Sequence, residues 1–202
     1  METNQIDFNL DSYCGIYCGA CDIMISYKTG KKQRLASVWN EKTVKLLHKG
    51  LGLKYDESKP FTQECHGCKS GQLFVNCSVC KKRECAISRN VAHCIDCTDY
   101  PCDEIRAMQK NASVLPHAKA NHANMEAIKT VGVRQWLSDQ QNRWKCPKCN
   151  MSFSWYSSAC NSCGTDLRKY TYRFSFIQFL LLRFGIYMIS RRQKFPVVKA
   201  GR

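Results

Sequence analysis

Cysteine constrains this chain more than any other residue, because 15 of its 202 residues are cysteines and most of them stand in C-x-x-C pairs. An odd number of cysteines cannot pair completely into disulfides, and the short spacing within each pair suits a metal ion better than a disulfide to a distant partner. The first residues, Met1 to Leu10, have no basic start and no apolar run, so we expect no secretory signal. The pattern predicts a metal-binding protein of a reducing compartment, and we expect a cytoplasmic location.

The last four cysteines give the most specific pattern. Two C-x-x-C knuckles stand ten residues apart and supply four thiolates, those of Cys146, Cys149, Cys160 and Cys163. Four thiolates close a tetrahedral shell and leave no position for water, which predicts a structural zinc ion. Between the knuckles, Phe153 and Trp155 alternate with serines, as in a β-strand. Gly164 follows the last ligand, where a turn often requires a positive φ. We therefore expect a β-hairpin zinc ribbon.

The upstream cysteines predict further metal sites without fixing which of them share a metal. We expect at least one more site within residues 10–110, drawn from two separate stretches of chain, with zinc as the metal and two or three zinc ions in all. Cys18 and Cys21 are the first candidates, with Cys94 and Cys97 as their expected partners. The full set of upstream candidates is Cys14, Cys18, Cys21, Cys65, Cys68, Cys77, Cys80, Cys85, Cys94, Cys97 and Cys102.

An iron–sulfur cluster is the alternative cofactor for these cysteines. Cys14, Cys18 and Cys21 have the C-x-x-x-C-x-x-C spacing that holds the [4Fe–4S] cluster of radical S-adenosylmethionine enzymes, but no barrel of alternating strands and helices is predicted after it. A cluster held by these three and a distal cysteine such as Cys102 stays open, because four-cysteine sets bind iron–sulfur clusters and zinc alike. His66 and His93 adjoin cysteines and are expected to be surface residues rather than ligands.

Helices are expected in most of the remaining chain. Apolar residues at helical spacing predict a helix over 31–49 that ends at Gly50 and Gly52, and the longest helix over 121–141. Acidic residues in a first turn predict a short helix over 103–110. The fold class is therefore small α+β, in three parts: a cysteine-rich, metal-stabilised helical domain with knuckle loops (1–140), the zinc ribbon (141–168), and a basic, apolar C-terminal tail helix (169–202).

Charge and hydropathy leave the partner of the tail open. The formal net charge is +15, and residues 168–202 carry nine basic residues and no acidic one. The apolar run over 174–189 has 16 residues and contains Arg183, so it is shorter than the ~18–20 residues of a membrane span. A helix packed on this chain or on a protein partner is preferred, and contact with a membrane surface through residues 174–192 is the alternative. Lysines and arginines over 28–49 could also contact nucleic acid, although a solvated helix face is the simpler interpretation.

The order and spacing of the cysteine motifs resemble a known family. The motifs are Tyr13-Cys14-Gly15-Ile16-Tyr17-Cys18-Gly19-Ala20-Cys21, Cys65-His66-Gly67-Cys68, Arg83-Glu84-Cys85-Ala86 and His93-Cys94-Ile95-Asp96-Cys97-Thr98-Asp99-Tyr100-Pro101-Cys102. Over residues 10–167 the chain resembles the family called domain of unknown function 3795, whose members often end in a stretch similar to Gly132-Val133-Arg134-Gln135-Trp136-Leu137 running into Trp144-Lys145-Cys146-Pro147-Lys148-Cys149. Cys77 and Cys80 are additional to the family pattern. The resemblance implies no activity.

The sequence therefore favours a non-catalytic, metal-stabilised module that binds protein or nucleic acid. An iron–sulfur or thiol redox protein that uses the N-terminal cysteines is the alternative. No G-x-S-x-G, P-loop, H-E-x-x-H or G-x-G-x-x-G motif occurs, so no catalytic residue is assigned and the enzyme question is left undecided.

Overall fold

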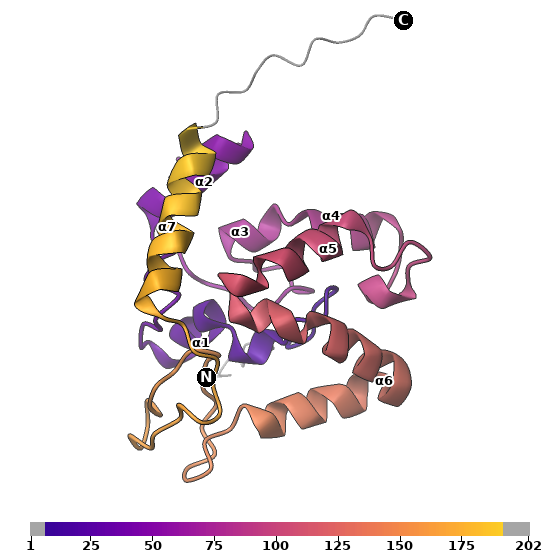
Figure 1. The fold of residues 1–202 in the computed structure, drawn as a ribbon, viewed down its shortest axis with the longest axis vertical. Coiled ribbons are helices and arrows are strands. Elements are labelled where there is room, and N and C mark those ends of the chain that lie inside the picture. The colour runs from indigo at the N-terminus through magenta and orange to yellow at the C-terminus, as the bar shows by residue number, and fades with distance from the viewer. Residues whose placement is uncertain (1–6, 192–202) are drawn as a thin grey trace, which may run out of the picture.

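The chain folds into helices joined by turns and loops (Figure 1). The structure, a computed structural model, describes residues 7–191. The part of the predicted tail beyond residue 191 lies outside the described residues. Short 3-10 turns connect some of the helices. The α-helices are α1 (Asp22–Thr29), α2 (Glu41–Leu51), α3 (Val75–Ser78), α4 (Lys81–Ser88), α5 (Asp103–Lys110), α6 (Asn121–Arg143) and α7 (Phe176–Arg191).

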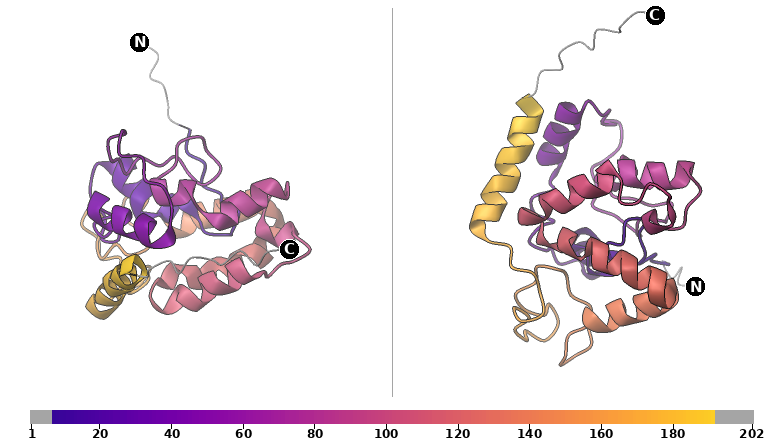
Figure 2. Two further views of the ribbon diagram at one scale, coloured as in Figure 1. Left: turned by 90° about the horizontal axis from the view of Figure 1, so that it is seen from above. Right: turned by 45° about the vertical axis from the view of Figure 1, so that its right-hand side comes forward.

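Most of the cysteines lie in the loops and short turns between the α-helices. α7 lies along α2, as all views of the ribbon show (Figures 1 and 2). α4 and α5 pack against each other on the other side of the molecule. The segment between α6 and α7, residues 144–175, contains both downstream knuckles and forms the loops below α7 in Figure 1.

The expected β-hairpin zinc ribbon, and with it the α+β fold class, is wrong. Residues 7–191 contain no β-strand, and the knuckle segment has only isolated antiparallel bridges, Lys145 with Ser152 and Ala159 with Asp166. A hairpin needs its backbone groups to pair between two strands. Here the N–H of Trp155 donates to the carbonyl of Ala20 at 3.0 Å, so this backbone pairs with another part of the chain.

Burial on all sides explains why the alternating pattern did not produce a strand. Phe153, Ser154, Trp155 and Tyr156 are all buried, so the segment has no solvent-facing side. The hydroxyls of Ser154 and Ser157 donate to the side-chain carbonyl of Gln33 at 3.3 and 3.1 Å. Ser154 and Ser157 therefore hold the loop inside the protein.

The helix expected over 31–49 is confirmed only in its second half. Residues 34–38 form turns, and α2 begins at Glu41, where the side chain of Asn40 accepts a hydrogen bond from the N–H of Thr43 at 3.1 Å. Asparagine at this position satisfies a free N–H of the first turn, so it starts the helix. The end is as predicted: Gly52 adopts a φ of 66°, a left-handed conformation that closes the last turn.

The other internal helices are confirmed. α5 covers the predicted residues 103–110, and α6 covers the predicted longest helix. α6 is interrupted at Gly132, whose φ of 80° and ψ of 157° are not helical. The chain turns there, so that the second arm returns toward the core and buries Trp136 against the edge of Tyr17 (Figure 1).

The main hydrophobic core joins the knuckle segment to the rest of the chain. Trp144, Phe153, Trp155, Tyr156 and Phe174 are buried together with residues of α6, α7 and the first cysteine segment. A smaller cluster lies around Phe74 and Val44 and includes Cys65. Residues from all three parts of the predicted division pack in the main core, and the domain boundaries themselves stay a prediction.

α7 begins with a capping box. The hydroxyl of Ser175 accepts from the N–H of Gln178 at 3.2 Å, while the side chain of Gln178 accepts from the N–H of Ser175 at 2.8 Å. One face, including Ile186, packs toward α2 and the core. The helix is too short to cross a membrane, and no other helix within residues 7–191 is long and apolar enough to do so.

The buried position of His117 leads us to expect that the folded chain loses stability in mild acid. Its ring stacks on Trp155 at 4.0 Å, and its Nδ1 accepts from the hydroxyl of Tyr156 at 2.6 Å. Burial lowers the pKa of His117 from 6.5 to about 3. Below pH 6.5 the imidazole of His117 takes up a proton in the unfolded chain but not in the folded chain. The contribution of His117 to the free energy of unfolding is therefore complete above pH 6.5 and is lost progressively as the pH falls toward 3.

We expect the contribution of His117 to the free energy of unfolding to fall by about 1–2 kcal/mol between pH 7 and pH 5. Urea unfolding at both pH values, for the native chain and for His117→Phe, measures this difference. The variant keeps an aromatic ring on Trp155 but does not titrate. Equal losses in the two proteins would show that His117 is not the cause.

Candidate metal centres

The four downstream cysteines come together as the sequence predicted. The sulfurs of Cys146, Cys149, Cys160 and Cys163 all lie within 4.8 Å of one another. The closest pairs are Cys149 with Cys160 at 3.5 Å and Cys146 with Cys163 at 3.6 Å. Each close pair joins one knuckle to the other. Cys146 and Cys160 are buried in the core, so this group, called the knuckle site below, could hold one metal ion and tie the two loops together.

The two knuckles have the same backbone construction. The N–H of Cys146 donates to the carbonyl of Met151 at 2.9 Å, and the N–H of Cys160 donates to the carbonyl of Thr165 at 2.9 Å. In each knuckle the residue after the second cysteine has a positive φ, which is 57° at Asn150 and 73° at Gly164. The conformation predicted for Gly164 is confirmed. These turns fix both cysteines of a knuckle by local geometry.

The electrostatics of the knuckle site favour a deprotonated ligand. Hydrogen bonds from the side chain and backbone of Thr165 lower the pKa of Cys163 to about 6. The hydroxyl of Thr165 lies 3.1 Å from that sulfur. A thiolate is the form of cysteine that binds metals, so Cys163 is already suited to a cation at neutral pH.

The upstream thiols fall into two neighbourhoods, which meet at Cys68 because its thiol lies near those of both Cys18 and Cys14. The first consists of Cys18, Cys21, Cys65 and Cys77, in which every pair is close enough for the thiolates to repel each other. The thiol of Cys77 donates a hydrogen bond to the sulfur of Cys65, which lowers the pKa of Cys65 to about 6. Cys21 and Cys77 also pack against the small hydrophobic cluster that contains Cys65. This group is called the inner thiol set below.

The second neighbourhood is formed around Cys14. Its thiol lies near those of Cys68 and Cys80, and Cys94 lies near Cys14 as well. A hydrogen bond of 2.7 Å from the N–H of Cys94 to the carbonyl of Tyr13 joins the two segments. The expected partnership of Cys18 and Cys21 with Cys94 and Cys97 stays a prediction, since the thiol of Cys94 lies near Cys14. The ligand sets of the upstream sites stay predictions.

The last upstream cysteines lie at the edge of this second group. Cys94 is near Cys102 and Cys85, and Cys85 is exposed. The guanidinium of Arg89 approaches the sulfur of Cys97 at 3.4 Å. Within residues 7–191, no upstream group of three ligand atoms is as tight as the knuckle site.

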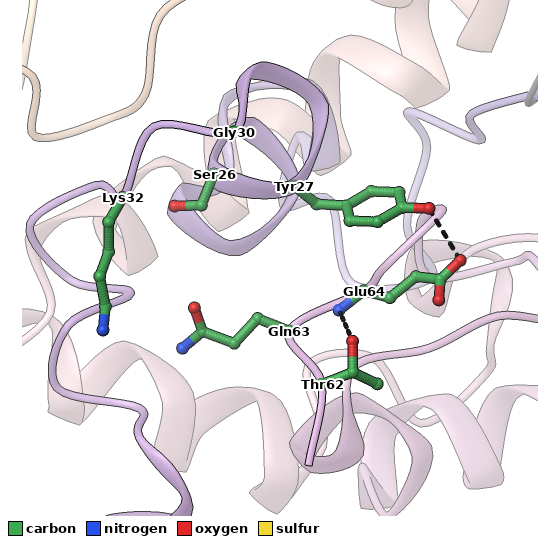
Figure 3. A pocket seen from close by; sticks show the side chains of 7 residues that line it. All are labelled: Ser26, Tyr27, Gly30, Lys32, Thr62, Gln63 and Glu64. Atoms are coloured by element: carbon green, nitrogen blue, oxygen red, sulfur yellow. Dashed lines mark hydrogen bonds between the residues drawn. The ribbon is translucent and has the colours of Figure 1, made fainter. Parts of the chain in front are cut away.

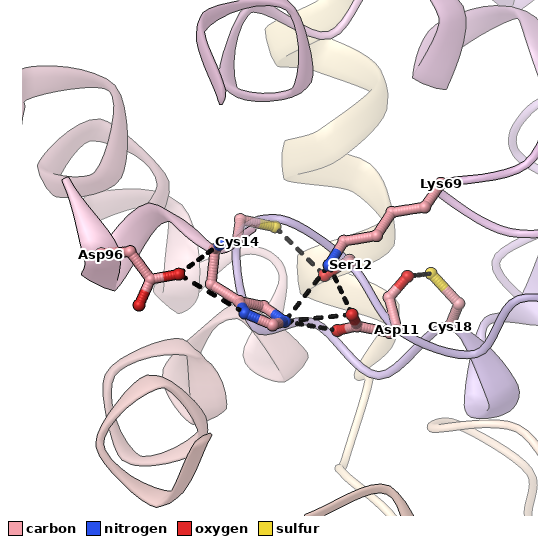
Figure 4. A network of polar contacts seen from close by, with 7 residues as sticks. Asp11, Ser12, Cys14, Cys18, Lys69 and Asp96 are labelled. Carbon is pink, nitrogen blue, oxygen red and sulfur yellow. Dashed lines mark hydrogen bonds and ion pairs between the residues drawn. The ribbon is translucent and has the colours of Figure 1, made fainter. Parts of the chain in front are cut away.

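A buried polar network, which sequence reasoning missed, holds the upstream segments together (Figure 4). The carboxylate of Asp11 binds Nζ of Lys69 at 2.5 Å and Nε2 of His93 at 3.0 Å. Burial acts to raise the pKa of Asp11, but these hydrogen bonds and charges outweigh it and keep that pKa below its usual value. The expectation that His93 is a surface residue is wrong, because it is buried against Asp11.

The network could not be predicted because its residues lie far apart in the sequence. Asp11, Lys69 and His93 come from three different cysteine segments, so no local spacing relates them. Single polar residues next to cysteines resemble ordinary surface positions in a sequence. Only the packing of the three segments removes them from water.

A pocket of about 240 Å³ opens beside α1 and has no cysteine among its lining residues (Figure 3). The hydroxyl of Tyr27 donates to the carboxylate of Glu64 at 2.9 Å, and Gln63 and Lys32 face the same space. These residues include no nucleophile paired with a base, so we assign no catalytic role to the pocket.

Several basic residues proposed for nucleic-acid contact already have partners within the chain. Nζ of Lys45 pairs with Glu41 at 3.1 Å, and Nζ of Lys31 donates to the carbonyl of Asn161 at 2.6 Å. The second bond attaches the segment before α2 to the second knuckle. The basic stretch over 28–49 is thus used partly for intramolecular contacts.

The fold and the cysteine groups define a helical, cysteine-rich protein with a four-thiol site that could hold a metal ion. Residues 10–107, a cysteine-rich segment, match the model of the family described as "Protein of unknown function (DUF3795)". The resemblance seen in the sequence is confirmed over these residues, while residues 108–167 lie outside the match. No curated protein and no solved structure was found to match the chain.

Proposed function

We propose that this protein is a non-catalytic binding module whose knuckle site holds one structural zinc ion. The proposal is based on the short distances between the four cysteine sulfurs of the knuckle site. A zinc ion bound tetrahedrally at about 2.3 Å from each sulfur requires sulfurs about 3.8 Å apart, and the closest pairs here stand at 3.5 and 3.6 Å. Four protein ligands leave no position for a substrate or a reactive water, so the metal has a structural role.

The surface that supports a binding role is the side of α7 that faces away from α2. It is lined by seven exposed apolar residues, and we call it the open face of α7. Phe176 and Ile177 are 67% and 68% exposed, values far above those of a core residue. Contiguous apolar surface of this kind commonly marks an interaction site. The residues of the open face are Phe176, Ile177, Leu180, Leu181, Phe184, Tyr187 and Met188.

A protein groove with an acidic rim is the partner that suits this surface. The open face follows one side of a regular helix, which is the form recognised when a helix enters an apolar groove. Arg173, Arg183 and Arg191 are exposed around the open face, and residues 168–191 contain no acidic residue. Acidic groups on the partner would complement these arginines and orient the helix.

Substitution of Phe184 tests the binding surface. Phe184→Glu puts a carboxylate in the middle of the open face, while Val131→Glu, a half-exposed apolar position in α6, is the matched control. A partner is captured with the native chain, identified, purified, and bound again from purified components. We expect Phe184→Glu to weaken that association about 30-fold or more, as for the loss of a central aromatic contact, and Val131→Glu to leave it unchanged.

Two results would contradict the proposal that the open face of α7 binds a protein groove. Equal binding of the partner by the native chain and by Phe184→Glu would remove α7 from the interface. Flotation of the full chain with vesicles of phosphatidylserine and phosphatidylcholine, abolished by Phe184→Glu, would replace the protein groove by an anionic membrane surface.

A further inference from the structure

The inner thiol set is assembled from three separate stretches of chain. Cys18 and Cys21 stand at either end of the first knuckle, Cys65 begins the second, and Cys77 begins the third. Cys65 is 6% exposed, and Cys21 and Cys77 pack on the same small cluster around Phe74. Four thiols gathered in one neighbourhood, without a disulfide among them, are a donor set that could hold a metal centre.

Backbone N–H groups point at the sulfurs of this set. The sulfur of Cys21 accepts from the N–H groups of Ile23 and Met24, and the sulfur of Cys65 accepts from those of Gly67 and Phe74. The sulfur of Cys146 in the knuckle site receives N–H groups in the same way, from Lys148 and Cys149. The inner thiol set therefore shares with the knuckle site the backbone N–H groups directed at its sulfurs, as in a metal-binding knuckle.

We propose that Cys18, Cys21, Cys65 and Cys77 are the four ligands of a second metal centre, and that its occupant is an iron–sulfur cluster. The spacing distinguishes this occupant from a single zinc ion. All the thiols of the knuckle site lie within 4.8 Å of one another, whereas in the described part of the chain no three thiols of the inner set do so. In a [4Fe–4S] cluster, the type proposed here, each cysteine binds a different iron, so the cysteine sulfurs stand further apart than around one ion.

The assignment separates Cys14 from Cys18 and Cys21. Cys14 lies against Cys68 and Cys80, so its thiol belongs to the second neighbourhood. The C-x-x-x-C-x-x-C segment therefore does not supply three ligands to one cluster, as it would in a radical S-adenosylmethionine enzyme. Likewise the second and third knuckles each place their first cysteine in the inner set, whereas Cys80 lies beside Cys14 and Cys68 lies near both Cys14 and Cys18.

Metal analysis of the full chain, purified without oxygen or chelator, tests the occupant. We expect a broad absorption band near ~400 nm, and iron and acid-labile sulfide at about four of each per cluster. The native protein alone gives this answer, so it does not depend on the folding of a variant. A colourless sample that contains zinc and no iron would overturn the proposed cluster.

Two serine variants test the ligand set. Cys77→Ser should lose most of the iron and of the absorption band, whereas Cys85→Ser, at an exposed cysteine outside the set, should keep both. Both variants should retain the zinc of the knuckle site, and this zinc content reports separately on the function proposed above. Iron kept by Cys77→Ser, or lost equally in Cys85→Ser, would overturn the assignment.

Discussion

Cys163→Ser is expected to release about one equivalent of zinc and to unfold the knuckle segment. This segment supplies Trp144, Phe153, Trp155 and Tyr156 to the main core, but within residues 7–191 it has no strand to hold its shape. Apparent binding free energies of about 10–16 kcal/mol are typical of structural zinc in small peptides, where the energy of binding is also the energy of folding. That range is comparable with the whole stability of an ordinary domain, about 5–15 kcal/mol.

Elemental analysis and tryptophan fluorescence measure the two effects. Zinc per chain should fall by about one equivalent, and the emission of the tryptophans should move to longer wavelength as Trp144 and Trp155 become exposed. Ser162→Ala is the matched control, since Ser162 lies in the same knuckle, is exposed and is not a ligand. Unchanged zinc stoichiometry in Cys163→Ser would refute the assignment of the site.

Asp11→Ala is expected to destabilise the chain by about 3–5 kcal/mol, the usual cost of removing one partner from a buried ion pair. The substitution leaves the ammonium of Lys69 and the ring of His93 without the carboxylate that both contact. Lys69 is only 19% exposed at its side chain, so water cannot fully replace the lost partner. Chemical unfolding at constant pH and metal content measures the change.

An exposed ion pair provides the control for Asp11. Glu41 pairs with Lys45 at 3.1 Å on the surface of α2, and its side chain is 49% exposed. We expect Glu41→Ala to cost less than about 1 kcal/mol, because exposed pairs are screened by water. If Asp11→Ala and Glu41→Ala lowered the free energy of unfolding by similar amounts, burial would not be the reason that the Asp11 network stabilises the chain.

The sequence by itself determined the features that depend on neighbouring residues. The three-residue separation within each C-x-x-C pair fixes two sulfurs on one turn, and Gly164 supplies the positive φ that closes it. Gly52 ends α2 for the same local reason, and the acidic start of α5 marks its first turn. The knuckle ligands could therefore be predicted, although the expected strand around them could not be trusted.

The tertiary structure decided how distant segments share their bonds. The N–H of Trp155 donates to the carbonyl of Ala20, and its carbonyl accepts from the N–H of Tyr172, so the knuckle segment forms no hairpin even though its residues alternate. The neighbours of each upstream thiol follow from long-range contacts, such as the bond from Cys94 to Tyr13, because identical C-x-x-C motifs do not encode which partner they meet. His93 became a buried partner of Asp11 for the same reason: desolvation depends on what packs around a residue, and the sequence near it does not state that.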